Sequence, residues 1–158
     1  ETLEEAGLWN RIWEESERAW FLGVVDLLKS RVQGVHDFAE YGRPFFTDDF
    51  DYEEDAVKRF LGGDDPSERA FLRDLLEQFR TVCRERQEFT LESTEAALRK
   101  LAEQSQIRAG KLIGAVRVVV TGRAQAPGIF DVLVTLGRQK TLERLERGVR
   151  MLRGADVS

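Results

Sequence analysis

The amino-acid sequence predicts an all-α fold, a helical bundle of two subdomains that span residues 1–88 and 89–158. Apolar residues recur at steps of three, four and seven along most of the chain, the spacing that places them on one face of an α-helix. Charged residues make up 34% of the chain, above the roughly 25% of an average domain, which indicates extensive solvated helix surface. No segment alternates between apolar and polar residues as a half-buried strand does.

The first part of the chain predicts a short helix over residues 2–13 and a long helix over residues 17–40. The long helix should break at Gly42-Arg43-Pro44, because proline cannot continue a helix and the residue before it favours an extended conformation. The apolar face of this helix comprises Trp20, Phe21, Val24, Val25, Leu28, Val32, Val35 and Phe38.

An aromatic and acidic connection over residues 45–51 leads to a short predicted helix over 52–61. The next helix has a clear start signal, since Asp65 can accept hydrogen bonds as the N-cap and Pro66 suits the first helical turn. Its predicted inward residues are Phe71, Leu72, Leu75, Leu76, Phe79 and Val82.

Thr90 is the predicted cap of a further helix, which Gly110 should end or interrupt. The segment 111–122 is ambiguous, because its valines favour a strand. A lone strand would find no partner in this chain and would leave its backbone groups without hydrogen bonds. We therefore predict a buried helix here, against the local propensity.

A loop over residues 122–127 precedes a short helix that Pro127 opens and Gly137 ends. The last predicted helix covers residues 140–152 and has one apolar and one basic face. Its inward residues are Leu142, Leu145, Val149 and Leu152, and its outward residues are Arg144, Arg147, Arg150 and Arg153.

Few residues in the sequence suit catalysis or metal binding. His36 is the only histidine and Cys83 the only cysteine, so the chain lacks the partners that a His/Cys metal site or a catalytic triad requires. The carboxylates of residues 48–55 lack the spacing of a calcium loop, which favours a solvated turn. The sequence contains neither a Walker-type phosphate loop nor a dinucleotide fingerprint. We expect no catalytic residue, metal or cofactor in this chain.

Charge is divided unevenly along the chain. Residues 1–98 carry 12 Lys and Arg against 24 Asp and Glu, whereas residues 99–158 carry 12 against 5. A basic half can steer a phosphate backbone to one face of a protein. Solvated helix faces with ordinary arginine usage would give the same count, so both interpretations stay open.

The sequence predicts no membrane span, because no segment holds the about 20 apolar residues that one requires. The acidic residues that follow Glu1 predict that no signal peptide is present. The chain does not begin with Met, and we expect it to be a fragment of a longer protein.

The segment from Lys111 to Arg147 is the remaining candidate for function. It joins several cationic side chains to a loop containing Gly and Pro, whose backbone groups could approach flat nucleobases. A helix-connecting turn with surface arginines has the same composition, and residue spacing alone favours neither a nucleobase-binding loop nor such a turn. The cationic residues that we single out in the segment are Arg117, Arg123, Arg138, Lys140, Arg144 and Arg147.

Motifs in this segment carry a family resemblance. Residues 111–123 read KLIGAVRVVVTGR, residues 126–133 read APGIFDVL, and residues 136–138 read LGR. This succession closely resembles the C-terminal part of bacterial glutamyl-tRNA synthetases. The sequence RPFF at 43–46 fits the same family, and the resemblance covers most of the chain from about Arg18 onward.

The resemblance implies the all-helical anticodon-binding domain of a class I aminoacyl-tRNA synthetase, which activates glutamate with ATP and attaches it to tRNA. The HIGH-like and KMSKS-like signatures of the catalytic domain do not occur in the sequence. The chain alone is therefore expected to be non-catalytic, with ATP a substrate of the parent enzyme. The implied partner is the anticodon loop of tRNA-Glu, and we expect a cytoplasmic monomer.

The motifs also imply which residues bind tRNA. By its place in the run that reads RVVVTG, Arg117 should approach the anticodon bases, together with Ala126, Pro127 and Ile129 of the loop that follows. Arg43 matches an arginine that reads the third anticodon base in discriminating members of the family. Its guanidinium could donate to the O2 and N3 acceptors of cytosine.

Two other functions remain open. A helical protein–protein adaptor would dock through the acidic N-terminal half. A hydrolase or transferase domain would need a nucleophile and a base, and the sequence shows no such set.

Overall fold

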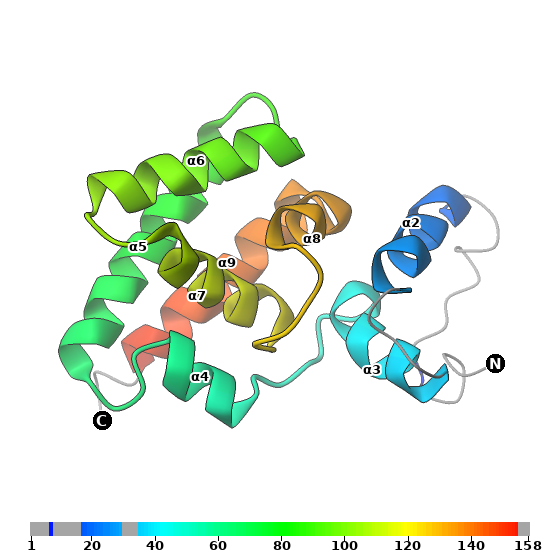
Figure 1. The fold of residues 1–158 in the computed structure, drawn as a ribbon, viewed down its shortest axis with the longest axis horizontal. Coiled ribbons are helices and arrows are strands. Elements are labelled where there is room, and N and C mark those ends of the chain that lie inside the picture. Colours follow the sequence, from blue (N-terminus) through cyan, green and yellow to red (C-terminus); the bar gives the residue numbers. More distant parts are fainter. Residues whose placement is uncertain (1–6, 8–16, 30–34, 155–158) are drawn as a thin grey trace. The chain divides into compact units, whose positions relative to one another are not determined.

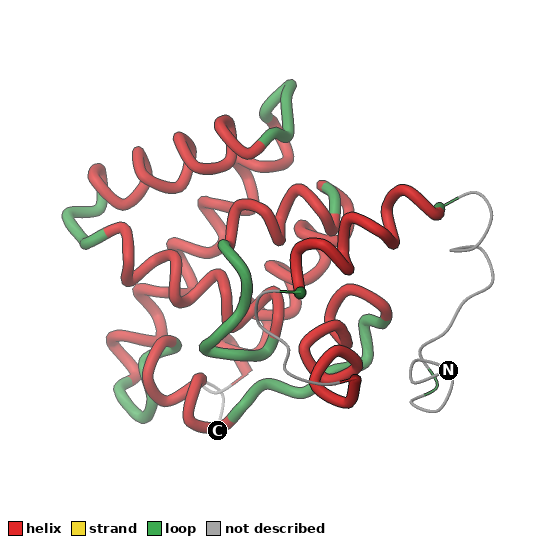
Figure 2. The backbone as a smooth tube through the Cα atoms, turned by 45° about the vertical axis from the view of Figure 1, so that its right-hand side comes forward, coloured by secondary structure: helices red, strands yellow, loops and turns green. Residues whose placement is uncertain are grey.

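The computed structural model describes residue 7 and residues 17–29 and 35–154, and over these residues it contains helices and loops but no strands (Figures 1 and 2). The all-α prediction is confirmed. Apart from residue 7, the predicted helix over 2–13 lies outside the described residues, as do residues 30–34 of the predicted long helix. The helices are α2 (Arg18–Leu28), α3 (Val35–Phe46), α4 (Glu54–Phe60), α5 (Pro66–Glu85), α6 (Leu91–Gln104), α7 (Ala109–Thr121), α8 (Ile129–Leu136) and α9 (Arg138–Gly154).

The chain divides into two compact units, Glu1–Phe50 and Asp51–Ser158. The first unit holds α2 and α3, and the second holds α4 to α9. The subdomain boundary near residue 88 stays a prediction.

In the first unit, aromatic contacts join α2 to the end of α3. The ring of Phe46 lies edge-on to Trp20, with 6.3 Å between the centroids, and 5.8 Å from the centroid of Phe21. The predicted break at Gly42-Arg43-Pro44 is wrong, because α3 continues through Pro44 to Phe46. Pro44 stands in the last turn of the helix, so the one i→i−4 hydrogen bond that it cannot donate is lost only near the helix end, and Phe46 after it packs against Trp20 and Phe21.

In the second unit, α7 is the central helix. It contacts α4, α5, α6, α8 and α9 (Figure 1). Its valines and leucine are fully buried, which confirms the predicted buried helix. Glycines allow two of these contacts to be close: a Cβ on Gly114 would collide with the ring of Phe60 on α4, and one on Gly148 of α9 would lie 2.5 Å from Val119 Cγ1.

Two helix starts predicted from the sequence are confirmed in detail. Asp65 caps α5, because its Oδ1 accepts from the backbone N–H groups of Ser67 at 3.0 Å and Glu68 at 3.3 Å. Thr90 and Ser93 form a reciprocal capping box at the start of α6.

Three predictions about helix ends and faces are wrong. The helix capped by Thr90 ends at Gln104, and Gly110 lies in the first turn of α7. Phe71, predicted to face inward, is 38% exposed. Arg144, predicted to face outward, is buried.

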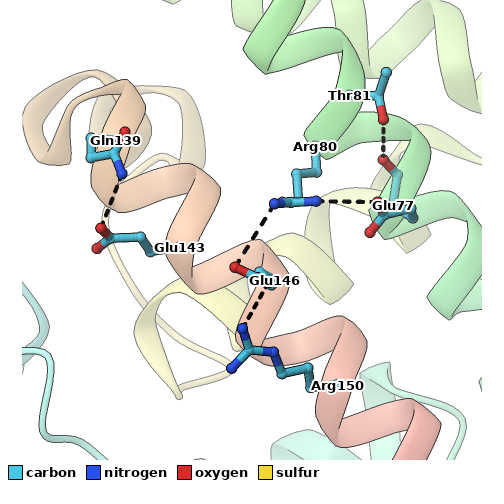
Figure 3. A network of polar contacts seen from close by, with 7 residues as sticks. All are labelled: Glu77, Arg80, Thr81, Gln139, Glu143, Glu146 and Arg150. Atoms are coloured by element: carbon cyan, nitrogen blue, oxygen red, sulfur yellow. Dashed lines mark hydrogen bonds and ion pairs between the residues drawn. The ribbon is translucent and has the colours of Figure 1, made fainter.

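A polar network joins α5 to α9 on the surface of the second unit (Figure 3). Arg80 on α5 pairs with Glu77 at 3.2 Å and reaches Glu146 on α9 at 3.8 Å. Arg150 Nη2 donates to the other oxygen of Glu146 at 2.7 Å. The guanidinium of Arg80 thereby lies between carboxylates of two helices that are distant in sequence.

Candidate nucleic-acid interface

The loop over residues 122–128, here called the α7–α8 loop, begins at a position whose backbone conformation only glycine adopts easily. Gly122 ends α7 in the left-handed conformation, with a φ of 78°. Its N–H donates to the carbonyl of Val118 at 2.6 Å. The chain therefore turns sharply away from the helix axis at this point.

The hydroxyl of Thr121 organises the first residues of the loop. Thr121 Oγ1 lies 2.7 Å from the carbonyl oxygen of Arg117, to which it donates, and it accepts from the backbone N–H of Arg123 at 3.2 Å. The Thr-Gly pair at 121–122 thus ties the loop to the last turn of α7.

Glu53, the N-cap residue of α4, holds the loop from the other side. Its backbone N–H donates to the carbonyl of Gly122 at 2.7 Å. Its carboxylate Oε1 accepts from the backbone N–H of Ala124 at 3.3 Å. Tyr52, the residue before it, lies under the guanidinium of Arg147 on α9, with Cζ 4.6 Å from the ring centroid.

Burial raises the pKa of the Tyr52 phenol to about 12, and the nearby charges of Arg147 and Arg144 offset that rise only in part. The phenol is therefore neutral at physiological pH. Arg144 itself donates from Nη1 to the carbonyl of Val120 at 2.9 Å, two residues before the loop.

Two of the predicted tRNA-binding residues, Ala126 and Pro127, lie in this loop, and two others lie on the helices before and after it. Arg117 lies half-buried on α7, one turn before Thr121. Ala126 is 7% exposed, Pro127 is buried, and Ile129 is 2% exposed at the start of α8. The last three therefore contribute little to the surface, and Gly128, which lies between Pro127 and Ile129, is exposed.

Other residues of the loop and its supports are not among the tRNA-binding residues that the motifs imply. Gln125 and Gly128 are its exposed residues, and Arg123 is half-buried. Glu53 and Arg144 contact the loop or the turn before it from elsewhere in the chain. In the sequence Arg144 stands out only as a cationic residue of the candidate segment, and nothing local distinguishes Glu53 from an ordinary surface charge.

Arg43, the fifth predicted residue, belongs to the first unit. Its Nε donates to the carbonyl of Asp49 at 2.9 Å, and its Nη2 lies 3.8 Å from the carboxylate of the same residue. The side chain is 41% exposed. Arg43 thus bridges the end of α3 and the acidic connection while presenting part of its guanidinium to solvent.

No cluster of three or more His, Cys, Asp or Glu side chains suited to a metal ion occurs within the described parts of the chain. In those same parts, no helix has the length and hydropathy needed to cross a membrane.

Comparisons with known proteins identify the family. The family model described as "Anticodon binding domain" matches residues 2–149. A glutamate–tRNA ligase 2 of Koribacter versatilis is 43% identical over 126 residues, which cover 80% of this chain and 25% of that protein. A glutamate–tRNA ligase of Desulfotalea psychrophila is 30% identical over 153 residues, which cover 94% of this chain and 29% of that protein. The chain thus spans between a quarter and a third of these relatives' length.

A solved structure has the same fold. The glutamate tRNA ligase from Elizabethkingia meningosepticum, crystallised in complex with its amino acid, superposes with a TM-score of 0.71 at 22% identity. The match covers 96% of this chain and 27% of that one. Together with the family model, which extends over nearly the whole sequence, these similarities show that the chain belongs to the anticodon binding domain family, in the form found in glutamate–tRNA ligases.

Proposed function

We propose that this chain recognises the anticodon loop of tRNA-Glu as the anticodon-binding part of a glutamate–tRNA ligase. The observation that carries the proposal is the family match over residues 2–149. The α7–α8 loop supports it, because its exposed residues Gln125 and Gly128 follow the half-buried Arg123 in a basic part of the chain. The whole ligase would activate glutamate with ATP and transfer it to tRNA in the cytoplasm. This chain by itself would be a monomer.

Two kinds of contact would contribute to tRNA binding, one to affinity and the other to selectivity. Arginine and lysine side chains would meet phosphates and supply an affinity that weakens as salt rises. Base edges and faces would supply the choice among tRNAs, since unpaired bases expose hydrogen-bonding groups and flat surfaces. Because Ala126, Pro127 and Ile129 are buried, the loop would read bases chiefly through its exposed residues, Gln125 and Gly128.

The test is a salt-titrated binding measurement with tRNA-Glu, tRNA-Gln and tRNA-Glu carrying a swapped anticodon. We expect the wild-type chain to bind tRNA-Glu more tightly than the swapped tRNA at every salt concentration. Arg117→Ala should narrow that preference, because a contact of the bases with an arginine is worth about 1–3 kcal/mol.

Arg99→Ala is the matched control. Arg99 carries the same charge, lies on α6 and pairs with Glu95 at 3.0 Å. Its loss should weaken binding to cognate and swapped tRNA alike or leave both unchanged. Equal affinity of the wild-type chain for all three tRNAs would overturn the proposal, and retention of a protein partner without RNA would favour the adaptor function instead.

A further inference from the structure

We propose that Glu53 is a positioning residue for anticodon recognition, and that its carboxylate holds the α7–α8 loop in the conformation that reads the bases. The inference rests on the proposed function and adds a residue that lies outside the motifs of that loop. Glu53 and Ala124 are 71 residues apart in the sequence, and a hydrogen bond joins them in the second unit.

The geometry of the N-cap supports this role. Short side chains such as Ser, Thr, Asp and Asn usually occupy an N-cap and accept from the helix's own N–H groups. Glu53 makes no such bond to α4. Its longer carboxylate instead accepts from the N–H of Ala124, in the loop.

The segment that carries Glu53 is itself anchored. The Tyr52 ring lies against Arg147 of α9, and the backbone N–H of Glu53 donates to Gly122 at 2.7 Å. The carboxylate is therefore presented from a fixed backbone, so that its bond to Ala124 can constrain the loop.

The consequence falls on the residues that follow. Gln125, the exposed side chain of the loop, comes directly after Ala124. If the Ala124 N–H is released, the loop backbone from Ala124 onward gains freedom, and ordering it again on RNA costs free energy that cognate contacts must offset. Loss of the Glu53 carboxylate should therefore reduce discrimination more than it reduces stability.

The experiment compares three variants of the whole 158-residue chain. Glu53→Ala removes the acceptor, whereas Glu53→Gln keeps an oxygen that can accept from Ala124. Glu54→Ala is the matched control, because Glu54 is the next residue, lies in the first turn of α4 and pairs with Lys58 across 3.6 Å on the surface. Glu53→Ala and Glu54→Ala remove the same charge, so general repulsion of RNA changes equally in both.

The main readout is the ratio of dissociation constants for an anticodon-swapped and a cognate tRNA-Glu stem-loop. We expect Glu53→Ala to lower this ratio about three- to tenfold, the size of one hydrogen bond's net contribution. Glu53→Gln and Glu54→Ala should keep the ratio within about twofold of wild type. A wild-type ratio for Glu53→Ala, or an equal loss in either of the other variants, would overturn the proposal.

Hydrogen exchange at the Ala124 amide gives a second readout, which needs no RNA. The exchange should accelerate in Glu53→Ala and stay slow in the other two variants, and unchanged exchange in Glu53→Ala would overturn the proposed restraint of the loop. If the wild-type chain itself fails to discriminate, the proposed function fails together with the role in recognition. The exchange rate then still decides whether Glu53 holds the loop.

Discussion

Arg144 on α9 donates from Nη1 to the carbonyl oxygen of Val120 at 2.9 Å, and only 3% of Arg144 is exposed. The last carbonyls of a helix have no partners within that helix and carry the negative end of its dipole. A buried guanidinium at this point stabilises the end of α7 directly before the loop that we propose reads the anticodon.

We expect Arg144→Met to destabilise the chain by about 2–4 kcal/mol, because the carbonyl of Val120 then remains buried without its charged donor. Methionine retains much of the length of the side chain. Denaturant-induced unfolding measures the difference, and Arg153→Met is the control, since Arg153 is exposed on the same helix. Equal stability of the two variants would contradict the role of the buried guanidinium.

Two glycines should respond in opposite ways to replacement by alanine. A Cβ on Gly148 would lie 2.5 Å from Val119 Cγ1, so Gly148→Ala should force α9 away from α7 and cost about 1–3 kcal/mol. A Cβ on Gly110 would meet nothing within 4 Å, and Gly110→Ala should stabilise α7 by about 0.5–1 kcal/mol. Thermal unfolding of both variants tests the pair, and the same sign for both would contradict the packing described here.

The carboxyl group of Glu146 should make stability depend on pH. The hydrogen bond from Arg150 and the charges of Arg150 and Arg80 lower the pKa of Glu146 below its ordinary value of 4.5 (Figure 3). A lowered pKa in the folded state means that the stabilisation is present above pH 4.5 and is lost as the pH falls through the folded-state pKa.

Melting temperatures of the wild type and Glu146→Gln over the range from about pH 3 to pH 7 test this prediction. The wild type should have the higher melting temperature at about pH 7, and the difference between the two melting temperatures should shrink at about pH 3. A difference that stays constant with pH would show that packing, and not charge, makes the contribution of Glu146.

Cys83 on α5 should resist modification while the chain is folded. Burial raises the pKa of its thiol to about 12, although the charges of Arg86 and Arg138 act in the opposite direction. The thiolate is the reactive form, so both protonation and burial protect the sulfur at neutral pH. Labelling with a disulfide reagent should be slow in the native chain and rapid in denaturant, and equal rates would contradict the burial of Cys83.

The helices of the second unit could be predicted because their determinants are local. The cap at Asp65 and the box at Thr90 depend on residues within three positions of each other. The segment 111–122 was harder, since its valines favour a strand. It was assigned correctly because a strand without a partner would leave its backbone groups unpaired.

The orientation of single side chains was less predictable. Phe71 and Leu72 are neighbours on α5, yet Phe71 is exposed and Leu72 is buried. Arg144 and Leu145 are neighbours on α9, and both are buried. Hydrophobic periodicity locates a face only to within about a residue, and the adjacent helices decide which borderline side chain is covered.

The candidate site, too, could be predicted only in part from the sequence. Its motifs pointed to Arg117 and to the loop at Pro127. In the structure Arg117 lies in the last turns of α7, and Pro127 lies in the loop just before α8. The structure also shows that Ala126 and Ile129 are buried, which only the packing of α8 could establish.

The sequence by itself determined the helical class, the caps and the family, because helix periodicity, capping and motif order are all written in short stretches of chain. Only the tertiary structure decided that the buried Arg144 donates to a carbonyl in the last turn of α7. It alone also decided that Glu53 accepts from Ala124, which is 71 residues away in the sequence. Such bonds form only where residues that are distant in sequence come close in space, and no pattern of neighbouring residues predicts which ones do.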